Sequence, residues 1–170
     1  MLDHVIYPPQ HDPRISAIYA LNEIDVKAPV ETVWQLLVEA ERWSDYFPPE
    51  DQVRILTGGS ELVLGTRYRR VTIGFPMSLM VTECVPYRRL SWATTVDGDD
   101  TGSTAFHGWV ITPTVDGCHV LTEETQQGPW FVQKLGVEYP GGLYSYHQDW
   151  VEALARAAEA KAANTQVWRA

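Results

Sequence analysis

The chain has 170 residues, of which 45% are hydrophobic, and its formal net charge is −9. This length allows one domain with a substantial core. The acidic excess argues against nucleic acid and anionic membrane surfaces as partners.

The two cysteines lack metal or redox spacing, so the sequence predicts neither a disulfide framework nor a zinc site around them. No apolar run reaches the length of a membrane span, and the first residues lack the pattern of a signal peptide. We therefore expect a cytoplasmic protein without membrane insertion.

Residues 1–20 carry three prolines among mixed polar and apolar residues, which predicts an extended arm packed on the domain. Such an arm can exchange between subunits, so the sequence is compatible with a homodimer. Residues 21–27 alternate imperfectly and are consistent with a first strand.

A helix is expected directly after this strand, because Pro29 suits its first turn and Glu31 complements the helix dipole. Val30, Val33 and Trp34 belong to its expected buried stripe, which continues to Leu37. A second short helix or turn covers residues 43–47, before the proline pair that follows.

From residue 53 onward, turn-forming residues separate short apolar runs, as in an antiparallel sheet. The strands expected here cover residues 53–57, 66–74, 78–85, 88–95, 104–112 and 118–126. Six consecutive strands with short connections favour a meander with one face open to a helix.

The last long segment, residues 143–163, predicts an amphipathic helix roughly 31 Å long. Its apolar stripe contains Leu143, His147, Trp150, Leu154 and Ala158 at helical spacing. The expected helix follows a break at residues 140–142. The predicted fold is α+β: a curved seven-stranded antiparallel sheet wrapped around this helix, with two short helices after the first strand.

Four stretches carry a resemblance to a known superfamily: residues 24–34, 65–68, 81–92 and 109–124. Together with the C-terminal helix they resemble the START-like (SRPBCC) proteins of helix-grip fold, most closely the polyketide cyclase/dehydrase branch. The resemblance covers residues 21–163 and leaves out the arm and the tail at 164–170. It implies a small hydrophobic or polycarbonyl molecule bound in a cavity between sheet and helix.

A hairpin around residues 116–117 brings two polar side chains together, if Ile111 pairs with Val120. His107 then lies opposite Glu124, and opposed Cβ atoms in a sheet are roughly 5 Å apart. A carboxylate beside an imidazole orients it and raises its pKa, as in a general base. The pair is therefore the candidate catalytic pair; the alternative is a polar pair that only stabilises the strands.

The same register places Trp109 opposite Thr122 and residue 105 opposite Gln126. The resemblance implies that Trp109 and Trp43 line the pocket, and we expect Thr122 or Gln126 to hold a ligand oxygen. Further candidate ligand contacts lie near the cavity mouth and on the helix stripe: Glu50, His147 and Trp150.

Strand 78–85 permits two orientations. Its alternation favours an inward set that includes Leu79 and Val81, whereas the resemblance implies that Met80, Thr82 and Cys84 face the cavity. We expect the second orientation. Aromatase/cyclase relatives carry an arginine near the position of Cys84, and its absence here argues against aromatic polyketide cyclisation.

The five histidines show no HxxxH or HxH spacing, so the sequence predicts no metal and no cofactor. Three functions stay open: a cofactor-independent cyclase/dehydratase using acid–base chemistry, a non-catalytic carrier of an apolar metabolite or lipid, and an accessory domain whose pocket has filled in. Tryptophans at 92 and 109 that fill the space between sheet and helix would contradict the first two.

Overall fold

A seven-stranded antiparallel sheet, in the strand order β1-β7-β6-β5-β4-β3-β2, forms the body of the computed structural model. The structure describes residues 4–72, 74–135 and 141–167. Predicted features at residues 1–3, 73, 140 and 168–170 lie outside this description. The strands are β1 (Ile18–Val26), β2 (Glu50–Ile55), β3 (Arg67–Thr72), β4 (Phe75–Val85), β5 (Arg89–Val96), β6 (Thr104–Pro113) and β7 (Cys118–Gln127).

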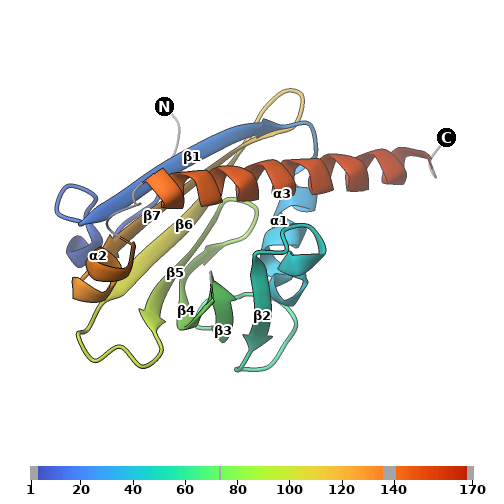
Figure 1. Cartoon of the computed structure of the whole chain (residues 1–170). Coiled ribbons are helices and arrows are strands. Elements are labelled where there is room, and N and C mark those ends of the chain that lie inside the picture. Colours follow the sequence, from blue (N-terminus) through green and yellow to red (C-terminus); the bar gives the residue numbers. More distant parts are fainter. Residues whose placement is uncertain (1–3, 73, 136–140, 168–170) are drawn as a thin grey trace.

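Helices cover one face of this sheet. The long helix α3 (Gly141–Val167) crosses the face, with α1 (Val30–Val38) beneath its C-terminal half (Figure 1). The short helix η2 (Ala40–Asp45) follows α1, and α2 (Pro129–Leu135) precedes α3. The helix-grip fold expected from the sequence is therefore confirmed, including the long C-terminal helix and the short helices after the first strand.

Local sequence explains the first helix. Pro29 is the residue before α1, Glu31 lies in its first turn, and Val33 and Leu37 are completely buried beneath it. Proline suits a helix start because its missing N–H has no helical partner there. The predicted buried stripe of this helix is confirmed.

The N-terminal arm packs on the opposite face of the sheet. Val5 joins Phe106, Val110 and Leu121 in a small cluster that is separate from the main core. The arm contains a single turn, η1 (Pro9–His11), and β1 begins at Ile18. The first strand thus starts three residues earlier than predicted and takes in the end of the expected arm.

Candidate functional site

The hairpin of β6 and β7 has the predicted register. Ile111 pairs with Val120, His107 with Glu124, Trp109 with Thr122 and Ala105 with Gln126. These side chains face α3, because Ala105, Trp109, Ile111 and Val120 all belong to the main core. The sheet thus carries His107 and Glu124 to the inner face that the helix covers.

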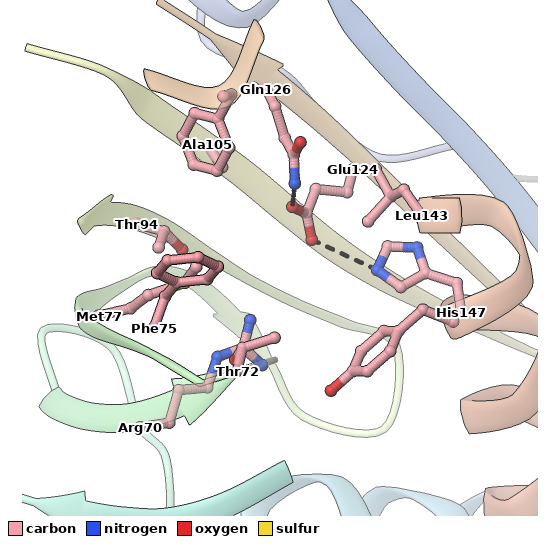
Figure 2. A pocket seen from close by; sticks show the side chains of 12 residues that line it. Arg70, Thr72, Phe75, Met77, Thr94, Ala105, Glu124, Gln126, Leu143 and His147 are labelled. Carbon is pink, nitrogen blue, oxygen red and sulfur yellow. Dashed lines mark hydrogen bonds and ion pairs between the residues drawn. The ribbon is translucent and has the colours of Figure 1, made fainter. Parts of the chain in front are cut away.

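Glu124 is the centre of a buried polar cluster. Its Oε2 lies 3.1 Å from Nδ1 of His107 and 3.3 Å from Nε2 of His147, which comes from α3. Its Oε1 accepts a 2.7 Å hydrogen bond from the Gln126 amide (Figure 2). The strand pair and the long helix therefore meet at a single carboxylate.

Burial and neighbouring charge set the protonation of this cluster. Burial lowers the pKa of His107 to about 3, and the nearby His147 acts in the same direction. Burial alone would raise the pKa of Glu124, but the two imidazoles hold it well below its ordinary value. At neutral pH the cluster thus contains an ionised carboxylate beside a neutral His107.

A second buried pair lies next to the first. Nη1 of Arg70 is 2.9 Å from Oε2 of Glu50, and the Tyr146 hydroxyl donates a 2.6 Å hydrogen bond to Oε1 of Glu50. Burial raises the pKa of Glu50, which the Arg70 guanidinium opposes. Burial would lower the pKa of Arg70, yet the Glu50 carboxylate raises it. The guanidinium also lies 5.7 Å from the centroid of the Trp150 ring.

A cavity of about 30 Å³ lies between these pairs and α3. Polar and apolar side chains are mixed in its lining: in Figure 2, Glu124, Leu143 and His147 lie on one side, and Arg70, Phe75 and Met77 lie on the other. The polar residues of the lining include Arg70, Glu124, Gln126 and His147, and the apolar residues include Phe75, Met77, Phe131 and Leu143. Such a volume holds about one water molecule.

Tryptophans fill the rest of the space between sheet and helix. Trp43, Trp92, Trp109 and Trp150 are buried almost completely. The Trp150 ring centroid lies 5.1 Å from that of Trp43 and 5.2 Å from that of Trp109. Trp43, Trp109 and Trp150 therefore lie in the packed core and not on the cavity wall, so the space they occupy is not open to a ligand.

The predicted orientation of β4 is wrong for two residues. Leu79 and Val81 are buried on the inner face, whereas Met80 is 42% exposed and Thr82 also faces outward. The alternation of apolar residues along the strand favoured the observed orientation, whereas the resemblance to the family implied the opposite one. A bulge between Val81 and Glu83 then turns Cys84 inward, where it packs against the core away from the cavity.

Two other candidates have contacts unlike those expected. Thr122 is completely buried behind the cavity, where its hydroxyl lies 2.7 Å from Nε2 of His107, so it is not placed to hold a ligand oxygen. Glu50 is completely buried against Arg70 and is not a gate at the cavity mouth. His147 and Gln126 do line the cavity, as expected.

Sequence reasoning missed Arg70. The alternation of β3 carries the signal, since Tyr68, Arg70 and Thr72 are buried while Arg67 and Arg69 are exposed. An inward arginine follows directly from its spacing to Tyr68. It reaches the cavity from β3, so the absence of an arginine near Cys84 does not leave this cavity without a cation.

Comparison with known proteins identifies relatives of the whole fold. A family model described as "Polyketide cyclase / dehydrase and lipid transport" matches residues 21–168. No curated protein matches the chain. The described part of the chain contains no helix long and apolar enough to cross a membrane.

Several solved structures are similar in fold. A hypothetical protein from Helicobacter pylori has a TM-score of 0.83 at 21% identity, covering 93% of this chain and 98% of its own. The di-domain ARO/CYC protein StfQ from the steffimycin biosynthetic pathway has a TM-score of 0.69 at 14% identity, covering 86% of this chain and 52% of its own. A putative protein from the dynemicin biosynthetic locus has a TM-score of 0.61 at 21% identity, covering 81% and 46%.

Proposed function

The chain belongs to the polyketide cyclase/dehydrase and lipid transport family, and from this premise we propose that it binds a small carbonyl compound and promotes its enolisation. The observation that carries the proposal is the lining of the cavity, which combines a cation, a carboxylate and an imidazole. Enolisation is the step shared by cyclisation and dehydration of carbonyl compounds, so the proposed reaction is consistent with the cyclase and dehydrase activities in the description of the family.

The polar side chains that line the cavity have separate tasks in this reaction. Nη1 of Arg70 is paired with Glu50, but its Nε is buried without a hydrogen-bond partner among the described residues, so the guanidinium can bind a carbonyl oxygen through Nε. The Glu124–His147 pair takes the proton from the carbon beside the carbonyl. The C–H electron pair then forms the C=C bond, and the oxygen becomes an enolate held by Arg70.

His107 has a positioning task in this proposal. It lies behind Glu124, completely buried, and does not line the cavity. Its Nδ1 lies 3.1 Å from Oε2 of Glu124 on the side away from the ligand, so the ring limits where the carboxylate can lie. The predicted catalytic pair therefore becomes a trio in which His147 and Glu124 face the ligand.

The size of the cavity argues for a small ligand. A volume of about 30 Å³ leaves no room for a folded polyketide or a lipid chain. A bound molecule of a few heavy atoms requires only a modest displacement of the cavity side chains. Trp92 and Trp109 fill the space between sheet and helix, which contradicts the expected cavity for a folded polycarbonyl substrate as well as that for a carried apolar metabolite or lipid. The proposal is therefore confined to a small ligand in the remaining polar cavity.

Deuterium exchange tests the proposed proton transfer. Pyruvate and 2-butanone are incubated with the protein in D₂O, and loss of the protons next to the carbonyl is followed by NMR. We expect acceleration over buffer on the order of 100-fold, the lower end of what positioned acid–base groups achieve. Glu124→Gln should abolish the acceleration while keeping the shape of the side chain.

The matched control is Glu152→Gln, which changes a partly exposed carboxylate on α3 that pairs with Arg156. This variant should exchange at the wild-type rate. Equal rates in wild type and Glu124→Gln, with both proteins folded, would show that the carboxylate takes no part in proton transfer.

A further inference from the structure

We infer that His107, Glu124 and His147 form a binding site for one divalent transition-metal ion of the zinc or iron(II) class, with a cavity water as an additional ligand. This goes beyond the proposed enolisation, since metal binding needs no carbonyl ligand and can be measured without one. The site is built from strands β6 and β7 and helix α3, which only the fold brings together.

Distances within the cluster suit a shared ion. One potential ligand atom from each residue lies within 4.8 Å of the other two, and all three residues are buried. The two distances to Oε2 of Glu124 are 3.1 and 3.3 Å. Ligand atoms bonded to tetrahedral zinc at about 2.0–2.2 Å are separated by roughly 3.3–3.5 Å. The two imidazole rings stack with their centroids 4.5 Å apart and their planes 20° apart, so one ring must rotate before both lone pairs point at one ion.

The orientation of His107 favours an ion over a hydrogen bond. Its Nδ1 lies 3.1 Å from Oε2 of Glu124, yet the two atoms are not aligned for a hydrogen bond, and Nδ1 has no other partner among the described residues. A nitrogen and an oxygen at this separation without a hydrogen bond between them are compatible with two ligands of one metal.

The surrounding side chains orient the potential ligands. Thr122 donates its hydroxyl proton to the carbonyl of Gly108 and lies 2.7 Å from Nε2 of His107, so it accepts the Nε2 proton and leaves a lone pair on Nδ1. Gln126 donates a hydrogen bond to Oε1 of Glu124, so Oε2 is the oxygen that faces the two histidines. Metal-binding histidines and carboxylates are commonly held in this way.

The charges on the site also fit a cation. Nδ1 of His147 is buried without a hydrogen-bond partner among the described residues, so it can carry the ring proton while Nε2 binds the ion. The neighbouring cation, Arg70, is neutralised by Glu50 at 2.9 Å.

The cavity supplies an open coordination position. Glu124 and His147 line it, and its volume of about 30 Å³ suits one water molecule. Two histidines, one carboxylate and a water make a set that zinc and iron(II) accept. Magnesium and calcium prefer sites made entirely of oxygen ligands, so we expect them to bind poorly.

Metal titration tests this inference. Untagged full-length protein, stripped with a chelator, is titrated with Co²⁺ while the visible absorption of the ion is recorded, and with Zn²⁺ by calorimetry. We expect one ion per chain, a Kd in the micromolar range or below, and a rise of several degrees in Tm. Mg²⁺ should produce neither signal.

Variants locate the site. His147→Gln and Glu124→Gln should each weaken Zn²⁺ binding at least 10-fold, and Thr122→Val should weaken it about 10-fold through loss of orientation. The control is His119→Gln, because His119 lies beside Glu23 and Asp25 on the surface and is the obvious adventitious site. This variant should bind as wild type does. Circular dichroism of the stripped proteins checks that each variant folds.

Two outcomes would overturn the inference: absence of stoichiometric binding by folded wild-type protein, or loss of binding in His119→Gln but not in Glu124→Gln. If the three side chains share a proton and bind no metal, the folded wild-type protein will show no stoichiometric binding. Deuterium exchange into the carbonyl compound can be measured on metal-free protein and does not depend on either metal-binding outcome. Failure of the metal site can therefore be distinguished from failure of the proposed enolisation.

Discussion

At the scale of single residues, the interior combines two charged groups that water cannot reach. Arg70 is 5% exposed and Glu50 is completely buried, and the guanidinium packs against the rings of Trp92 and Trp150. Removing water from two such charges is costly unless each stays paired with the other. The pair therefore holds β2 and β3 in place as well as supplying the cation of the cavity.

Arg70→Met leaves Glu50 without its cation, and we expect a loss of about 3–5 kcal/mol in the free energy of unfolding. Adding Glu50→Gln should recover much of this loss, because no buried charge then lacks a partner. Urea denaturation measures both effects.

The control is Arg69→Met on the same strand, where the side chain is 59% exposed and pairs with Asp97. Exposed pairs contribute at most about 1 kcal/mol. If Arg70→Met lowered the free energy of unfolding no more than Arg69→Met does, the buried pair would contribute no more to stability than an exposed pair.

At the scale of elements, the N-terminal arm is fixed to the outer face by close backbone approach. The amide of Val5 donates to Glu123, and the Tyr19 hydroxyl donates to the same carboxylate. Val5 lies directly over Gly108, where a Cβ atom would come within 2.5 Å of the valine side chain. The glycine in β6 is thus explained by the arm that covers it.

Gly108→Ala should push the arm away from the sheet and cost about 1–3 kcal/mol of stability. Hydrogen exchange of the Val5 amide should speed up, because its hydrogen bond to Glu123 weakens. Pairing the change with Val5→Ala makes room for the new methyl group, so the double variant should be more stable than Gly108→Ala alone. If it were less stable, the contact with Val5 would not be the cause.

At the scale of the whole molecule, α3 is held in the sheet by aromatic packing. The Trp150 ring stacks at 5.4 Å on Phe47 and meets Trp43 and Trp109 edge to face. In a helix-grip protein this space is where a ligand cavity would lie. Tryptophan side chains occupy it here, which leaves the small polar cavity at the N-terminal end of α3.

Trp150→Ala should reopen this space, at a cost of about 3–5 kcal/mol. Engineered apolar cavities of about 150 Å³ bind small aromatic molecules. We therefore expect added indole to raise the Tm of Trp150→Ala but not that of wild type. Trp34→Ala is the control, since Trp34 lies on α1 beside the exposed Tyr87. An equal response of the two variants would argue against a filled cavity.

Local pattern determined much of this protein from sequence alone. Alternation along the strands, proline before α1 and the apolar stripe of α3 predicted the sheet, the helices and even the His107–Glu124 pairing, because each depends on residues close in sequence or on one hairpin register. Alternation along β3 and β4 also indicated that Arg70 points inward and that Met80 points outward. The bulge at Val81/Glu83 interrupts that alternation, so Cys84 could not be placed by counting.

Tertiary structure decided what the interior became. His147 reaches Glu124 only because α3 crosses β7, and spacing rules for metal ligands detect pairs on one element, so the three-residue cluster has no signature in the sequence. The volume of the cavity likewise depends on how side chains from many elements pack together. Whether four tryptophans line a pocket or fill it depends on how sheet and helix pack, and here they fill it.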